Sequence, residues 1–149
     1  MQLSKNFSFD ELTVTSRTSL QKSNRTSAKS FIKQLKYTAG ALEEIRELLG
    51  VPMTVTSGFR MPILNKAVGG SATSKHTQGL CADVIPIGIS VNEAFEKIRV
   101  GKDSLDSVRK VIIEGVLGKS WLHVQAKVLA TEPTELFATT DGKNFNKVV

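Results

Sequence analysis

The chain has 149 residues, of which 40% are hydrophobic and 23% are charged, and its formal net charge at pH 7 is +6. These proportions are those of a soluble globular protein, and the length suits one compact domain over residues 1–149. No apolar run approaches the roughly 20 residues of a membrane span, which excludes a transmembrane helix.

The first 25 residues are rich in Ser, Thr and Asn, and we predict that most of them form loop. One short apolar patch among them is expected to pack one turn onto the core, and it consists of Phe7, Phe9 and Leu12. From about Ala28 apolar residues recur at helical spacing as far as Leu49, which predicts a long amphipathic helix. We expect it to be capped at Thr26 or Ser27 and to end at Gly50.

Glutamates gather near the end of this predicted helix, at Glu43, Glu44 and Glu47. They could be mistaken for a catalytic carboxylate cluster. Because they stand at helical spacing beside Arg46, we interpret them as a solvated face without chemistry.

A strand is predicted over residues 53–56, and Arg60 follows it at the mouth of a loop. An arginine after a strand end can present two parallel donors to a carboxylate. The alternative is a surface arginine that caps a helix or pairs with an acid. The glycine-rich residues 68–72 are expected to be flexible loop.

His76 and Asp83 stand seven positions apart with Gly79 between them. This spacing suits one metal ligand on a loop, a tight turn, and a second ligand on the strand predicted at 82–85. The alternative is a loop histidine and an ordinary turn or capping aspartate. Cys81 is the only cysteine, so no intramolecular disulfide can form, and we interpret it as inert buried packing.

A shorter helix is predicted over residues 91–100, beginning near Ser90 or Asn92 and ending at Gly101. Residues 103–108 add a turn at most. Two strands then follow at 110–114 and 121–126, joined by residues 115–120 as a hairpin. The tail predicts another hairpin, with strands at 134–139 and 144–149 around Asp141-Gly142, and we interpret it as structural.

The second of the two histidines, His123, lies in the alternating pattern Trp121-Leu122-His123-Val124. If Glu114 pairs with Trp121, then Ile112 pairs with His123, and directly paired residues share a face of the sheet. The opposite face is then entirely apolar. This register places Glu114 and His123 on one face at diagonal spacing, about 7–8 Å between backbones. Two imidazoles and one carboxylate, here His76, His123 and Asp83, make a familiar zinc ligand set in hydrolases.

A set of residues spread over most of the chain forms one recognisable pattern: Ser57-Gly58-Phe59-Arg60, Asn65, Val68-Gly69-Gly70-Ser71, Ser74-Lys75-His76, Gly79, Asp83 and Trp121-Leu122-His123-Val124. In order and spacing this pattern resembles the family of zinc D-Ala-D-Ala carboxypeptidases and L-Ala-D-Glu endopeptidases, which includes peptidoglycan-cutting enzymes of bacteria and bacteriophages. The opening residues 6–12 resemble the start of its phage-type members.

The resemblance implies a zinc ion on His76, Asp83 and His123, with Arg60 and Ser74 holding the carboxylate of a peptidoglycan stem peptide. It also implies an α+β domain in which a long helix and shorter helices pack on a small, mainly antiparallel sheet that carries the zinc site. In this reading the metal polarises the scissile carbonyl and a carboxylate passes a proton from water to the leaving amine.

One position departs from the family pattern. Many relatives carry an acid or a histidine three residues before the second histidine, whereas this chain has Ser120. Serine cannot act as a base, so either Glu114 takes this catalytic role from the neighbouring strand, or the protein is an inactive zinc-stapled module that binds cell wall or builds a virion.

Other partners are less well supported by the residues. Nucleic acid is not expected, because the chain has no basic run with interleaved aromatic residues and no zinc-finger spacing. No secretory signal pattern stands at the N-terminus, so we expect synthesis in the cytoplasm and action on the wall after release or within a virion. We expect a monomer.

Overall fold

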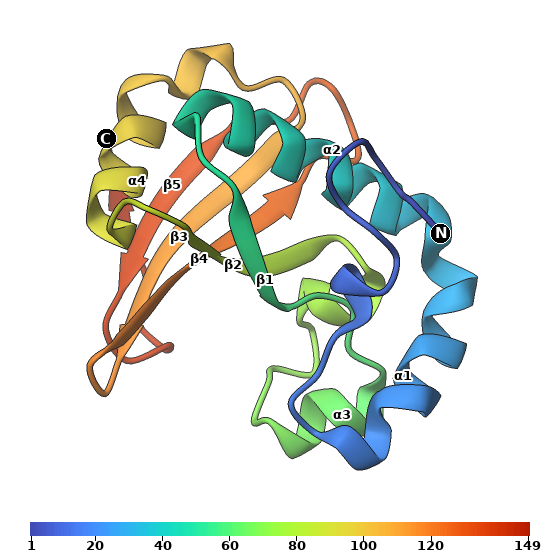
Figure 1. Ribbon diagram of the computed structural model, residues 1–149. Helices are drawn as coiled ribbons and strands as arrows, with labels where there is room; N and C mark the ends of the chain where they lie inside the picture. Colours follow the sequence, from blue (N-terminus) through green and yellow to red (C-terminus); the bar gives the residue numbers. More distant parts are fainter.

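A six-stranded sheet forms the frame of the molecule, with the strand order β1-β2-β4-β3-β5-β6 (Figure 1). The computed structural model describes residues 1–149. Its strands are β1 Met53–Ser57, β2 Cys81–Pro86, β3 Val108–Val116, β4 Lys119–Ala126, β5 Glu135–Thr139 and β6 Asn146–Val148. Every neighbouring pair is antiparallel except β3 and β5, which run parallel. The predicted α+β fold with a mainly antiparallel sheet is therefore confirmed.

Two helices cover one face of this sheet (Figure 1). They are α2 Ile32–Leu49 and α4 Val91–Val100, and the smaller helices α1 Gln21–Ala28 and α3 Pro62–Ala67 lie beyond the end of β1. Leu35, Leu42 and Ile45 of α2 are completely buried against the apolar face of the hairpin, where Leu122 and Val124 are also at 0% exposure. Burial of these aliphatic side chains is the main stabilising contribution to the fold. None of the helices combines the length and the apolar composition that a membrane crossing requires.

The end of the long helix was predicted correctly, but its start was not. Gly50 takes the left-handed conformation (φ 71°) that closes α2, as glycine commonly does. Thr26 and Ser27 are not caps, because both lie inside α1. A 3₁₀ turn, Lys29–Phe31, joins α1 to α2 end to end. The chain therefore enters α2 already helical and needs no side-chain cap.

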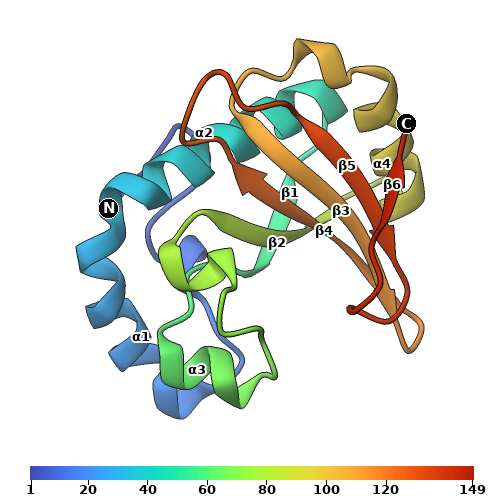
Figure 2. The ribbon, with the colours of Figure 1, turned by 180° about the vertical axis from the view of Figure 1, so that it is seen from behind.

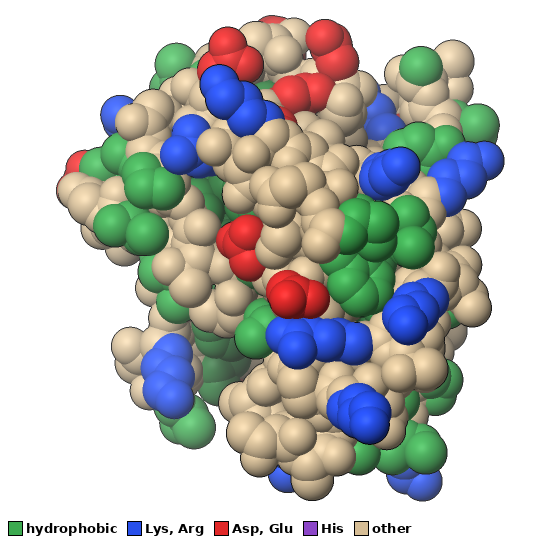
Figure 3. All heavy atoms as spheres, turned by 45° about the vertical axis from the view of Figure 1, so that its right-hand side comes forward, with side chains coloured by type: hydrophobic (Ala, Val, Ile, Leu, Met, Phe, Trp, Pro, Cys, Tyr) green, Lys and Arg blue, Asp and Glu red, His purple; other side chains and the backbone are tan.

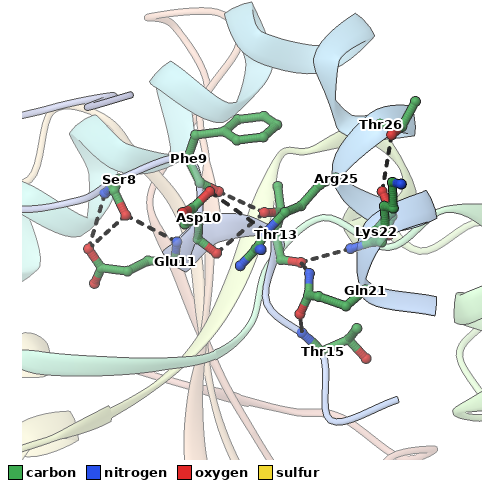
Figure 4. Close-up of polar contacts among 11 residues, drawn as sticks. Ser8, Phe9, Asp10, Glu11, Thr13, Thr15, Gln21, Lys22, Arg25 and Thr26 are labelled. Carbon is green, nitrogen blue, oxygen red and sulfur yellow. Dashed lines mark hydrogen bonds and ion pairs between the residues drawn. The ribbon is translucent and has the colours of Figure 1, made fainter. Parts of the chain in front are cut away.

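The N-terminal segment is more ordered than its composition predicted. Two 3₁₀ turns, Glu11–Thr13 and Thr18–Leu20, precede α1. Figure 4 shows how polar side chains brace them: Gln21 donates to the Thr13 carbonyl at 2.8 Å and accepts from the Thr15 N–H at 2.9 Å. Phe7, Phe9 and Leu12 are buried, as predicted. The prediction of loop holds for most of this segment but missed both 3₁₀ turns and the start of α1, where polar side chains such as Gln21 bond to backbone groups nearby.

Two of the three glutamates near the end of α2 accept hydrogen bonds from distant segments of the chain, which the prediction of a solvated face did not anticipate. The Glu43 carboxylate accepts hydrogen bonds from Ser4 Oγ at 2.9 Å, from Asn6 N at 2.7 Å and from Asn6 Nδ2 at 2.8 Å. Glu44 accepts from the N–H groups of Asp106 and Ser107. Burial opposes ionisation of Glu43, but the Asn6 bonds outweigh it and lower the pKa of that carboxyl.

The register predicted for the β3–β4 hairpin is the one observed. Glu114 pairs with Trp121, and Ile112 pairs with His123. The strands run further than predicted, to Val116 and Lys119, so that only Leu117 and Gly118 form the turn. Both turn residues have positive φ, 53° and 79°, which suits the twist of a two-residue hairpin turn. The predicted six-residue connection was therefore too long.

Helix α4 and the tail hairpin also follow the sequence pattern. The Ser90 hydroxyl caps α4 by accepting from the Glu93 N–H, and Gly101 ends the helix. Strands β5 and β6 form an antiparallel pair on either side of Asp141-Gly142. The parallel contact between β5 and β3 was not anticipated. It places the tail beside Glu114, which pairs with Thr139.

Candidate metal centre and its cleft

A cleft of about 840 Å³ opens on the face of the sheet opposite to α2 and α4. Its floor comes from β2, β3 and β4, with side chains that include Asp83, Glu114 and His123. One wall is Arg60 together with lining residues between positions 68 and 76. This segment follows α3 and leads through the turn that carries His76 into β2 (Figure 2). The other wall is the tail turn, residues 141–145. The prediction that the tail is only structural was incomplete, because its turn lines the cleft.

His76 is buried at 3% exposure in the 3₁₀ turn Lys75–Gln78, which Gly79 closes with φ 72°. Its Nδ1 atom lies 2.8 Å from the carbonyl oxygen of Gly58. Because a carbonyl can only accept, Nδ1 carries a hydrogen, and Nε2 is the ring nitrogen that faces Asp83. The Ser74 hydroxyl accepts from the His76 N–H at 3.2 Å and so helps to fix the turn.

Asp83 and His123 face each other directly on the paired strands β2 and β4. The two carboxylate oxygens of Asp83 serve different histidines: Oδ2 lies 3.3 Å from His76 Nε2, and Oδ1 lies 3.2 Å from His123 Nδ1. The imidazole rings stand edge to face, with centroids 5.3 Å apart. The structure thus brings together the three side chains that the sequence singled out.

The charge balance of this cluster favours a cation between its members. Burial opposes ionisation of Asp83, yet the two histidines outweigh it and hold the pKa of that carboxyl well below its usual range. Burial likewise opposes protonation of His123, but Cys81 and Asp83 raise the pKa of His123 to about 9. His76 Nε2 and Asp83 Oδ2, 3.3 Å apart, attract each other only with a proton or a metal ion between them. Two imidazoles and one carboxylate, with a carbonyl orienting one ring from behind, suit zinc.

Cys81 offers a second donor beside this cluster. It lies on β2 two residues before Asp83, and its sulfur and a nitrogen of each histidine ring lie within 4.8 Å of one another. Burial raises the pKa of the Cys81 thiol, although a thiol that coordinates a metal ion loses its proton. Cys81 and Asp83 are therefore both candidates for a third ligand beside the two histidines.

Arg60 is held by backbone contacts on both sides of its Cα atom. Its N–H donates to the His76 carbonyl at 3.0 Å, and the side chain of Asn24 bonds to the backbone of Phe59 and Met61. A Cβ atom on Gly58 would lie 2.1 Å from the Leu12 carbonyl oxygen, so only glycine fits there. The buried Nε of Arg60 has no hydrogen-bond partner in the protein. Sequence reasoning missed Asn24, because an asparagine among Ser and Thr is typical of loops.

Glu114 lies on the floor of the cleft, where it accepts a hydrogen bond from the Trp121 indole. A carboxylate oxygen of Glu114, one of Asp83 and a ring nitrogen of His123 lie within 4.8 Å of one another. Burial and then the charge of Asp83 raise the pKa of Glu114. Ser120 pairs with Gly115 near the exposed end of the hairpin.

Comparison with known protein families finds a match to Peptidase M15 over residues 5–110. The chain belongs to the Peptidase M15 family. The matched segment contains Arg60, Ser74, His76 and Asp83, whereas Glu114 and His123 lie beyond its end. No match was found among curated proteins.

Membership in the Peptidase M15 family gives the coarse chemistry of the cleft. The family consists of zinc-dependent metallopeptidases, which are hydrolases that act on peptidoglycan. A donor set with two histidines in the cleft is in keeping with that chemistry.

Proposed function

We propose that this protein is a zinc-dependent peptidase that hydrolyses a peptide bond in the peptidoglycan stem peptide, with His76, Asp83 and His123 as the metal ligands. The observation that carries the proposal is the meeting of both histidines on the two oxygens of one carboxylate. These side chains come from a turn and two paired strands, and the Gly58 carbonyl fixes the ring of His76. This arrangement ties one turn and two strands together through the carboxylate of Asp83.

Zinc, when bound, supplies Lewis acidity that polarises a carbonyl and lowers the pKa of a coordinated water to about 7. Glu114 is the proposed general base, which accepts a proton from the attacking water and returns it to the leaving amine. Its raised pKa suits this role, because a base works best when its pKa approaches the working pH. The Trp121 indole donates to the Glu114 carboxylate and limits its rotation.

Arg60 and Ser74 are proposed to hold a carboxylate of the peptide. Both line the cleft wall beside His76. The Arg60 side chain lines the cleft and forms no ion pair within the protein, so its guanidinium is available to a substrate carboxylate. The Ser74 hydroxyl accepts from a backbone N–H and keeps its own hydrogen available for donation.

The test is incubation with defined muropeptides, with and without a chelator, followed by identification of the products by mass spectrometry. We expect one new product set, either from D-Ala-D-Ala or from L-Ala-D-Glu, that disappears with the chelator. Metal analysis should find one zinc per chain, and His76→Ala should lose it. Removal of zinc should also lower the thermal stability, because the ligands tie two strands to a turn.

Two results would overturn the proposal in different ways. Stoichiometric zinc without cleavage of any muropeptide would instead support the inactive zinc-stapled module. Absence of stoichiometric zinc, or its full retention in His76→Ala, would contradict the ligand assignment itself.

A further inference from the structure

Four cationic side chains line the cleft, and none of them has an acidic partner. They are Arg60 and Lys75 on the wall beside His76, and Lys110 and Lys143 on the side of β3 and the tail turn. The ion pairs of the protein involve other cations, such as Arg99, Arg109 and Lys147. On the face drawn in Figure 3, acidic side chains lie near the top and at the centre, intermixed with Lys and Arg. Unpaired positive charge in the cleft is therefore not simply part of a uniformly basic surface.

The carboxylates in the cleft are already engaged within the protein. Asp83 contacts both histidines, and Glu114 accepts from Trp121. Asp141 turns back into its own loop, where its carboxylate accepts from the N–H groups of Lys143 and Asn144, each at 2.8 Å. These bonds hold the pKa of Asp141 well below its usual range. None of the three acids is left to neutralise the lysines.

The tail turn is a built part of the cleft wall. Its Asp141 side chain also accepts from Thr139 Oγ1, and Thr139 in turn pairs with Glu114 across β5 and β3. The tail turn therefore begins on β5, the strand next to the one that carries the proposed base Glu114. The ammonium group of Lys110 lies over the Phe137 ring, 5.0 Å from its centre. This cation–π contact does not neutralise the charge of Lys110.

We propose that Lys110 and Lys143 bind a second carboxylate of the substrate, internal to the stem peptide, on the side of the reacting centre opposite to Arg60. The proposal rests on the proposed function and makes the tail turn a specificity element. Arg60 would take one carboxylate and the two lysines another. The protein would therefore select stem peptides by the charge of their internal acids, because an uncharged amide gains little from an ammonium.

Trp121 provides a direct probe, because it is the only tryptophan and lines the cleft. Its fluorescence can follow the titration of two stem pentapeptides that end in D-Ala-D-Ala. One has free internal carboxylates and the other has them amidated. Titrations with the zinc-loaded protein at low temperature, over times too short for turnover, report binding alone. We expect the free acid to bind about three- to tenfold more tightly, and less so at high salt.

The preference for the free-acid peptide should disappear in the double variant Lys110→Gln, Lys143→Gln. It should persist in Lys147→Gln, a matched tail variant whose ammonium is already paired with Glu135 at 3.1 Å. Equal binding of the two peptides by the wild type, or an unchanged preference in the double variant, would overturn the inference. Cleavage of muropeptides is measured separately, so an inactive protein that still prefers the free acid would refute the proposed function and leave this subsite standing.

Discussion

Asn24 is the residue whose replacement should expose how the cleft wall is held. It is completely buried on α1, and its amide nitrogen donates to the carbonyls of Thr13 at 3.0 Å and Phe59 at 2.9 Å. Its Oδ1 accepts from the Met61 N–H at 2.8 Å. One side chain thus fixes the backbone on both sides of Arg60.

The cost of Asn24→Ala can be counted from these partners. The Thr13 carbonyl keeps a second donor, Gln21 Nε2, so it is not orphaned. The Phe59 carbonyl and the Met61 N–H lose the partner that Asn24 supplies. At about 1–3 kcal/mol for each buried group left unsatisfied, the free energy of unfolding should fall by about 2–6 kcal/mol. That is a large share of the roughly 5–15 kcal/mol of a typical domain.

Urea unfolding at pH 7 measures this loss, and Asn92→Ala is the matched control. Asn92 is exposed in the first turn of α4 and makes no side-chain hydrogen bond, so its replacement should change stability by about 0.5 kcal/mol or less. Asn24→Asp keeps the acceptor for Met61 but loses both donors, so its defect should shrink at acid pH, where the carboxyl regains an O–H. A loss below about 1 kcal/mol for Asn24→Ala would refute the reasoning.

Three further predictions concern catalysis and the contact of the N-terminal residues Ser4 and Asn6 with Glu43. Glu114→Gln should fold and keep zinc but lose a factor of about 10²–10⁴ in kcat; near wild-type cleavage would place the base elsewhere. Arg60→Lys keeps the charge but loses the paired donors, so it should weaken turnover without loss of zinc, and unchanged kinetics would make Arg60 a surface residue. Glu43→Gln should lower the free energy of unfolding at pH 7 by about 1 kcal/mol, whereas Glu47→Gln should not. Since the pKa of Glu43 is lowered from 4.5, this difference should be complete above that pH and vanish as the pH falls below it; a difference that persists in acid would contradict the role of the charge.

Much of the fold could be predicted from the sequence, because the residue patterns that specify it lie within short segments of the chain. Alternation of apolar and polar residues predicted the β3–β4 register, since a shift of one residue would turn Leu122 and Val124 away from the core. Gly50 ended α2 and Ser90 began α4 through bonds within a few residues. The three proposed metal ligands were found by their residue types and order, and the structure brings them together.

Other features could be seen only in the tertiary structure, because they depend on contacts between residues far apart in the chain. Glu43 looked solvated until folding placed Ser4 and Asn6 against it, and Asn24 looked like loop until Met61 came within 2.8 Å. The tail looked structural until β5 paired in parallel with β3 and brought its turn to the cleft. Composition and periodicity describe how a segment presents its own side chains, whereas a buried donor or a strand edge takes its partner from whichever distant segment folding delivers.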